Sequence, residues 1–562
     1  MRGLAVSVTD GDHLHARVTS SPGHPGAPGQ NTRHAANARN AWLLVGILGV
    51  LGISGLGAAC TPAEARATAD QPPAELLVSV AIGPVTTLRN LQAYAEAIQP
   101  GTGATLTDQA VRRGLAEAVG ASSLDGFDPA SGMYLLIAHV DGSPAPALLG
   151  KVTDAKTLAA SASATGAMFK GSWAVIGAKP VLDRIGPYAL ATIAPQRAPT
   201  APTATVWLSQ VVARYKTEIE AVRSQMMASI AQPSAGRMTQ FMTSYLDGLG
   251  SFITDADKLI VTLEVTADLG SLDFALLAKP GSRLAKFVAL QRPGDYALLD
   301  RLPAATPSVL LGGHLEVGPY RDGILETIAA MYGSDASKEL LAAMDAFRKA
   351  MTGDIAMTIQ SAPGTGLAFT QLFRLSDAAA AQKAITAILD LFKVGRSIEA
   401  MGMTTTIKTN PATTMHDGVA LRSYEATYDL SKVEPAQRKA MEAMLPSTQA
   451  RAQIATFDAL GLVVLAPDSL AEAGLTIDAA RGKAPHFVAP TLTGELLAAS
   501  RARKDSLAMM MDLGALLAKI TGRAPTVAAP ILISLGCADH NAHLRLALPA
   551  VTLRAAVNGA KP

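Results

Sequence analysis

Cysteine, aromatic side chains and net charge are all scarce in this chain. Of its 562 residues two are cysteines and 4% are aromatic, and 48 lysines and arginines face 46 aspartates and glutamates. Without the four arginines and two aspartates of residues 1–59, 44 of each sign remain. A neutral body cannot supply the counterion release that drives nucleic-acid binding, and few aromatic rings are available for stacking on bases. Nucleic acid is therefore excluded as a partner.

Local motifs for catalysis are also missing. The chain has no G-x-x-x-x-G-K-[ST], H-E-x-x-H, paired C-x-x-C or G-x-S-x-G. The glycine-rich stretches 100–105 and 363–366 lack the lysine that a phosphate loop needs, so they are read as turns. His139, His314 and His416 have no carboxylate at a sequence spacing that would orient the ring. We therefore predict no catalytic residue and no cofactor.

The N-terminal region does carry a clear pattern. Residues 14–62 contain no acidic side chain, and three arginines precede an uncharged apolar stretch of 19 residues, 41–59. This layout is typical of an export signal. The stretch is just long enough to span a bilayer, but its five glycines weaken it as a permanent helix. A transient, cleaved segment is therefore expected.

The apolar stretch ends in Leu56-Gly57-Ala58-Ala59-Cys60, which resembles the lipobox of bacterial lipoprotein precursors. The resemblance covers Arg33 to Cys60, and Gly57 stands where an aliphatic residue is usual. It implies cleavage before Cys60 and lipidation of its thiol. An ordinary signal peptide cut after Ala59, or an uncleaved anchor, remains the alternative. Residues 1–59 are then a disordered leader with a signal peptide, and residues 60–73 are a flexible tether.

The body has the pattern of an α+β protein with mainly antiparallel sheets and long amphipathic helices. Four pairs of segments recur in the same order, and in the second pair a hydroxyl residue, Thr153 or Ser376, is expected to cap a helix. We predict two tandem copies, residues 74–290 and 305–558, although generic alternation of strands and helices remains the alternative. The pairs are Ser79-Val80 and Gly83 with Ser308-Val309 and Gly312, 151–155 with 374–378, 173–180 with 460–467, and 272–288 with 541–557.

The second copy is predicted to contain an insertion at about residues 393–455. Within it, the pattern predicts a hairpin of two strands, 404–410 and 419–430, joined through a loop that contains His416-Asp417-Gly418, followed by a helix that begins at Pro435. Apolar residues at spacings of three or four predict further helices over 208–230, 238–252 and 496–520, the last including Met509–Met511. A methionine-lined helix can line an apolar pocket, but core packing is the more frequent role.

One cluster near the C-terminus combines ligand types that zinc accepts. Cys537, Asp539, His540 and His543 lie within seven residues, and a hairpin would bring Cys537 and His543 together across its loop. Asp539, His540 and Asn541 are equally what a tight turn between two strands contains. Cys537, His540 and His543 therefore stay weak candidates, and no metal site is predicted.

The leader and the missing motifs together favour a non-catalytic lipoprotein of the cell envelope. Cys60 would hold it to a membrane, on the outer membrane or the periplasmic face, where it binds an envelope protein, a lipid or another apolar ligand. The alternative is an exported hydrolase or metal-dependent enzyme whose catalytic residues are dispersed along the chain and therefore form no local motif.

Overall fold

The computed structural model describes residues 72–83, 85–196, 200–230, 250–320, 334–362, 366–392, 395–400, 403–433, 438, 449–515, 530–538 and 541–559. The chain divides into two compact units, Met1–Gly52 and Ile53–Pro562, and every described residue belongs to the second. The predicted leader, Cys60, residues 238–249 of the helix predicted over 238–252, nearly all of the helix predicted after Pro435, and Asp539 and His540 lie outside the described residues. None of the described helices has the length and hydrophobicity needed to cross a membrane.

The strands that the structure describes form one sheet in which every neighbouring pair is antiparallel. This confirms the predicted α+β class, with a single large sheet in place of several. Its order is β4 (Ala167–Lys170), β5 (Trp173–Gly177), β3 (Ser143–Lys151), β2 (Met133–Val140), β1 (Leu76–Ile82), β6 (Thr203–Trp207), β7 (Ala256–Val265), β8 (Leu269–Ala278), β19 (Asn541–Pro549), β18 (Pro530–Ala538), β17 (Leu507–Asp512), β9 (Val309–His314), β10 (Met351–Ala362), β11 (Gly366–Leu375), β16 (Leu460–Ala466), β15 (Gln449–Phe457), β14 (Val419–Asp429), β13 (Met403–His416) and β12 (Arg396–Ala400).

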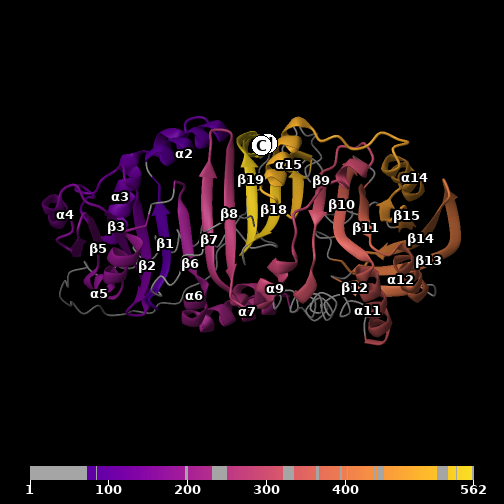
Figure 1. Ribbon diagram of the computed structural model, residues 1–562, viewed down its shortest axis with the longest axis horizontal. Coiled ribbons are helices and arrows are strands. Elements are labelled where there is room, and N and C mark those ends of the chain that lie inside the picture. The colour runs from indigo at the N-terminus through magenta and orange to yellow at the C-terminus, as the bar shows by residue number, and fades with distance from the viewer. Residues whose placement is uncertain are drawn as a thin grey trace, which may run out of the picture. The chain divides into compact units, whose positions relative to one another are not determined.

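The C-terminal strands return to the middle of the sheet, where β18 and β19 lie between β8 and β9 (Figure 1). Two runs of strands extend outward from the β8–β19 pair. One reads β8-β7-β6-β1-β2-β3-β5-β4, and the other reads β19-β18-β17-β9-β10-β11-β16-β15. Both runs follow the same order when their strands are numbered along the chain. Strands β12, β13 and β14 extend only the second run.

In the described residues, helices connect the strands, and several of them pack against the sheet. They are α2 (Val85–Ile98), α3 (Asp108–Val119), α4 (Ala155–Ser161), α5 (Lys179–Tyr188), α6 (Leu208–Arg214), α7 (Lys216–Ile230), α9 (Arg283–Leu290), α11 (Ser334–Lys349), α12 (Ala378–Leu391), α14 (Ser469–Ala480), α15 (Thr491–Ala502) and α17 (Ala550–Gly559). Each half has an aliphatic core: Leu136, Leu149 and Ile185 are fully buried in the first, and Leu372 and Leu462 in the second.

Helices α4 and α12 begin with the same cap. Asp154 and Asp377 have φ/ψ angles of −139°/101° and −141°/98°, and their carboxylates accept hydrogen bonds from backbone N–H groups of the first turn. The sequence prediction placed these caps on Thr153 and Ser376, which is wrong by one residue. A carboxylate is as good a cap as a hydroxyl and also favours the positive end of the helix dipole.

Two other predictions meet different outcomes. The hairpin of β13 and β14 is confirmed: His416 pairs with Val419, and Asp417 and Gly418 have φ angles of 47° and 77°, as a two-residue hairpin turn requires. The helix predicted over 496–520 is wrong in its middle, because α15 ends at Ala502 and Met509–Met511 lie on β17. A short apolar run fits a buried strand as well as a helix.

Candidate functional site

The described chain begins against helix α6. The Pro72 carbonyl accepts a hydrogen bond from Nε2 of Gln210 at 3.3 Å. The Pro73 carbonyl accepts one from Leu76 N–H at 2.9 Å, and the Glu75 carbonyl accepts one from His139 N–H at 2.7 Å. These bonds fix the start of the described body beside α6 and the end of β2.

Helix α6 joins α7 at Tyr215, which is held to the sheet. The Tyr215 hydroxyl lies 2.9 Å from Nδ1 of His139 on β2, and the two rings pack edge to face with centroids 5.4 Å apart. Burial lowers the pKa of His139, so its ring is neutral near pH 7. The helix predicted over 208–230 is interrupted at Tyr215, between α6 and α7. The contact of Tyr215 with His139 thus lies at the point where α7 starts.

Helix α7 is exposed along the whole of residues 216–225. Ile219 and Val222, three residues apart and so on one face, are 44% and 59% exposed. Lys216 and Glu220 form an ion pair at 3.9 Å along the helix. The helix thus presents large aliphatic side chains to the surroundings instead of to the sheet, and Figure 1 places it at the lower edge of the sheet beside α6.

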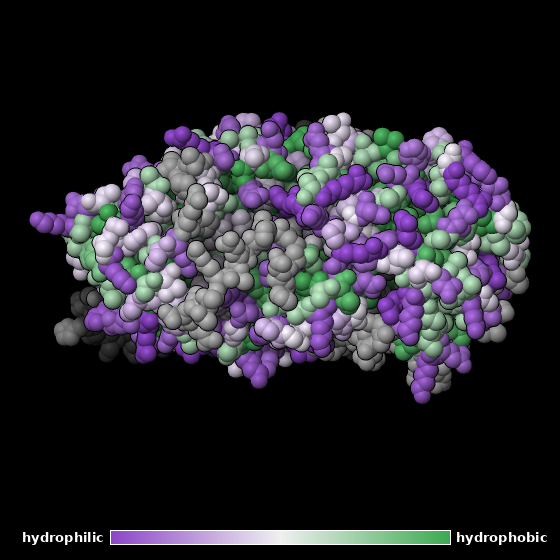
Figure 2. All heavy atoms as spheres, in the orientation of Figure 1, coloured by the Kyte–Doolittle hydropathy of each residue, from purple (hydrophilic) through white to green (hydrophobic). Residues whose placement is uncertain are grey.

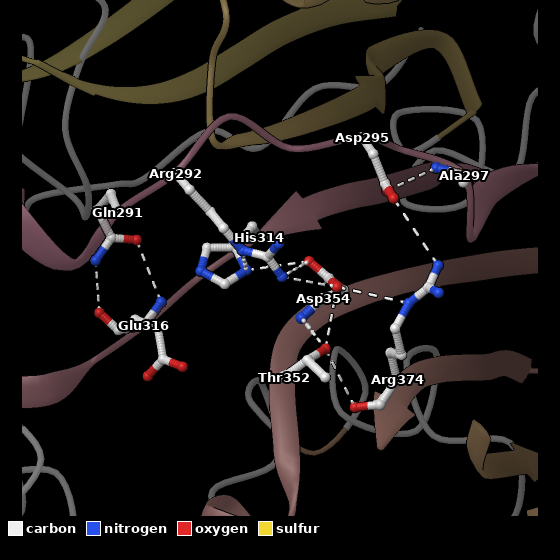
Figure 3. Close-up of polar contacts among 9 residues, drawn as sticks. All are labelled: Gln291, Arg292, Asp295, Ala297, His314, Glu316, Thr352, Asp354 and Arg374. Carbon is white, nitrogen blue, oxygen red and sulfur yellow. Dashed lines mark hydrogen bonds and ion pairs between the residues drawn. The ribbon is translucent and has the colours of Figure 1, made fainter. Parts of the chain in front are cut away.

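A second feature is a polar cluster around the buried Asp354 on β10, which we call the Asp354 cluster (Figure 3). Arg292 Nη2 donates to both carboxylate oxygens at 2.9 and 3.0 Å, and Thr352 Oγ1 donates at 3.0 Å. Nδ1 of His314 lies 3.0 Å from Oδ1, and the Arg374 guanidinium lies 3.6 Å from Oδ2. Both oxygens are therefore committed to partners, which suits a structural tie better than proton transfer.

The Asp354 cluster attaches the segment between the two halves to the second half. Gln291, in the same segment as Arg292, exchanges two hydrogen bonds with the Glu316 backbone. Gly353 has a φ of 86°, and a Cβ there would lie 2.7 Å from Cε1 of His314. Only glycine allows the two strands to approach closely enough for this contact.

No carboxylate lies at a sequence spacing that would orient His139, His314 or His416, yet in the folded chain two of these rings meet a carboxylate from a distant segment. His314 meets Asp354 across 40 residues of sequence, and Nε2 of His416 lies 3.1 Å from Asp478 across 62 residues. Local spacing gives no sign of these pairs, because strand pairing and helix packing bring them together. His139 meets a tyrosine hydroxyl instead.

A third feature lies on the central strands, where Asp273 of β8 and His543 of β19 are diagonal neighbours on one face of the sheet. Nδ1 of His543 is 3.7 Å from Oδ1 of Asp273, beyond hydrogen-bond distance. Among the residues that the structure describes, neither His543 nitrogen, nor Oδ1 of Asp273, has a hydrogen-bond partner. Burial raises the pKa of Asp273 to about 6 and lowers the pKa of His543 to about 4. We call these two residues the central pair.

The register of β18 and β19 separates two of the candidate zinc ligands. Cys537 pairs with Ala542, and Gly536 pairs with His543. Since neighbouring residues of a strand point to opposite faces, the Cys537 thiol and the His543 imidazole lie on opposite sides of the sheet. Cys537 packs with Leu535 and Ala542. Among the described side chains no group of three potential ligands is close enough to hold a metal ion.

Comparisons with known proteins give little similarity. No family model matches the chain, and no curated protein matches it. A solved structure titled "Structure of crystal form III of TP0453" aligns with a TM-score of 0.22 and 9% sequence identity, over 46% of this chain and 97% of that one. The chain thus has a distant structural match to TP0453, and no family is assigned to it.

Proposed function

We propose that this protein is an exported, non-catalytic lipoprotein of the cell envelope, anchored through Cys60 and acting by binding an envelope protein, a lipid or an apolar ligand. The observation that carries the proposal is that the described chain begins at Pro72 against α6, which leads into α7, a helix that exposes Ile219 and Val222. A body held by a tether at this point presents a binding surface next to its anchor. The charge-neutral composition suits contact with apolar groups better than with acidic partners.

The anchor is tested by fatty-acid labelling of the full chain. Wild type and Cys537→Ser are expected to take up label and to fractionate with membranes, whereas Cys60→Ser takes up none. Cys537→Ser is the matched control, because it removes the other cysteine and leaves the leader intact. Wild type without label would overturn the lipoprotein proposal, and Cys60→Ser of unchanged size in the membrane would indicate an uncleaved anchor.

We also infer that the body arose by duplication of one strand and helix unit. The support is the common strand order of the two runs and the matching caps at Asp154 and Asp377. The predicted insertion then corresponds to β12, β13 and β14, which have no counterpart in the first run. The pair at Ser79 and Ser308 supports it poorly, because Ser79 lies inside β1 and Ser308 precedes β9.

The central pair favours the second candidate function, an exported hydrolase. The imidazole of His543 and Oδ1 of Asp273 lie 3.7 Å apart and have no hydrogen-bond partner in the part of the chain that the structure describes, whereas both carboxylate oxygens of Asp354 have partners. Hydrolysis of a panel of chromogenic esters by the full chain is the test. Turnover that is lost in His543→Gln and retained in Cys537→Ser would favour the enzyme, and the absence of turnover in wild type would count against it.

A further inference from the structure

We infer that Arg545 is a pH-dependent switch where the two halves of the sheet meet: it binds Glu264 while Asp273 is neutral, and it binds Asp273 once that carboxyl is ionised. The inference goes beyond the proposed function, because it depends on neither the lipid anchor nor a catalytic role of the central pair. It begins from the side chain of Arg545 on β19, whose Nη2 donates to Glu264 at 3.0 Å and to Ser271 at 3.1 Å. One guanidinium thus links a strand of the second half to β7 and β8 of the first half.

The strand register makes Asp273 the nearer of the two carboxyls in the sheet. Asp273 is directly opposite Arg545 in the pair of β8 with β19, and such residues have Cβ atoms about 5 Å apart on one face. Glu264 lies one strand further away, on β7, where it is opposite Ser271. Yet Oδ1 of Asp273 and Nε of Arg545 are both buried, and neither atom has a hydrogen-bond partner among the described residues. The arginine therefore passes the nearer carboxyl and binds the further one.

The other charged groups around Asp273 do not compete with Arg545 for it. Arg503 Nη2 donates to Asp505 at 2.9 Å and is thereby engaged. His543 has its Nδ1 3.7 Å from Oδ1 of Asp273, and burial lowers its pKa to about 4, so the ring carries no charge near neutral pH. The titratable and charged groups that face Asp273 in the described chain are Arg545 and His543 of β19, Glu264 of β7, and Arg503 and Asp505 of the segment between α15 and β17.

Ionisation of Asp273 reverses the balance between the two partners. Burial raises the pKa of Asp273 to about 6, so below that pH the carboxyl is neutral and needs no cation. Above it, a buried carboxylate without a partner is costly, whereas an ion pair with the 58% exposed Glu264 side chain contributes little. The structure shows the arrangement expected for neutral Asp273. Its side chain is 26% exposed, so protons can exchange with solvent.

The switch changes which strands the arginine connects. Both carboxyls lie within reach of one arginine side chain, so rotation about its torsions is sufficient and no strand has to move. When Asp273 is ionised, Arg545 keeps β19 linked to β8 and gives up its link to β7. The released Glu264 is solvated, because its side chain is already exposed. Hydrophilic residues also predominate on the side of the molecule that Figure 2 shows. The side-chain connection between the halves therefore differs below and above pH 6.

The test is a double-mutant cycle between Arg545→Met and Glu264→Gln, measured by denaturant unfolding of the full chain at pH 5 and pH 7.5. The coupling between the two substitutions should change the unfolding equilibrium constant about threefold at pH 5 and less than about 1.5-fold at pH 7.5. In an Asp273→Asn background, which cannot ionise, it should remain about threefold at both pH values. Should Arg545→Met fail to fold, the effect of Glu264→Gln alone, at an exposed position, gives the same comparison.

The matched control is another ion pair between an arginine and a glutamate on neighbouring strands, Arg451 of β15 with Glu425 of β14. The same substitutions there should give a coupling that does not change between the two pH values. Equal coupling of Arg545 and Glu264 at pH 5 and pH 7.5 would overturn the inference, and so would its absence at both. A coupling that is lost at pH 7.5 even in Asp273→Asn would mean that Asp273 is not the trigger, which also overturns it.

Discussion

The Asp354 cluster and the central pair both place a carboxylate beside an imidazole within the same sheet, yet they differ in how far their polar atoms are satisfied. Asp354 and His314 lie 3.0 Å apart and share Arg292, while Asp273 and His543 lie 3.7 Å apart. A buried carboxylate stabilises a fold only when its partners replace the water it loses. We therefore expect the first pair to stabilise the native state and the second to cost stability.

The strand register explains why the polar atoms of the two pairs are satisfied to different extents. Arg545 pairs with Asp273 across β19 and β8, but its guanidinium donates to Glu264 and Ser271 at 3.0 and 3.1 Å. The hydrogen bonds of Arg545 thus go to other residues, and burial is the largest cause of the raised pKa of Asp273. Asp354 instead receives Arg292 from a segment outside the sheet, whose approach is not limited by strand spacing.

The largest effect is expected for Asp354→Ala. Removing the carboxylate takes one partner from buried His314 and the acceptor from Arg292 Nη2, and should lower the free energy of unfolding by about 3 kcal/mol. Denaturant unfolding of the full chain measures this. Asp478→Ala, which removes the half-exposed partner of His416, is the matched control and should cost less than about 1 kcal/mol. Equal losses in the two variants would mean that burial does not distinguish these pairs.

Local sequence chemistry predicted only part of this arrangement. The turn at Asp417-Gly418 was predictable, because two adjacent residues with positive φ have a recognisable composition. The Asp354 cluster was not, since Arg292 and Asp354 are 62 residues apart and meet only after the strands pair. The sequence was sufficient in principle to place Cys537 and His543 on opposite faces of the sheet. Side chains alternate between the two faces along each strand, so the face of each residue follows from its distance to a two-residue turn.

The central strands were harder to predict because their neighbours come from opposite ends of the body. Asp273 and His543 meet through the pairing of β8 with β19, which no local pattern encodes. Met509–Met511 were misassigned for a related reason. A strand that is buried between β18 and β9 has no alternation of polar and apolar residues to distinguish it from a helix.

The next prediction uses pH to separate the two members of the central pair. The folded pKa of Asp273, about 6, is above its unfolded value, so its contribution to stability is full below pH 3.8 and is lost as pH rises through 6. The folded pKa of His543, about 4, is depressed, so its contribution is present above pH 6.5 and is lost as pH falls through 4. The two contributions oppose each other between pH 4 and 6.

Single substitutions should therefore give opposite pH slopes. As pH falls from 6.5 to 4, His543→Leu should gain about 2 kcal/mol of unfolding free energy relative to wild type, and Asp273→Asn should lose a similar amount. Denaturation midpoints measured across this range give both slopes. Parallel curves for the two variants and wild type would show that neither group titrates abnormally, and the contrast with the Asp354 cluster would disappear.

The smallest expected effect compares one hydroxyl from each site. Thr352→Val keeps the shape of the side chain and removes a donor to Asp354 at 3.0 Å, which should lower the free energy of unfolding by about 1 kcal/mol. Ser271→Ala removes an acceptor for Arg545 at 3.1 Å and should cost about 0.5 kcal/mol, since Glu264 still binds that guanidinium. Thermal unfolding of both variants beside wild type measures the difference. A larger loss for Ser271→Ala than for Thr352→Val would contradict this order. It would mean that the remaining partners of Asp354 suffice without the Thr352 hydroxyl, while the central strands depend on the hydrogen bond between Arg545 and Ser271.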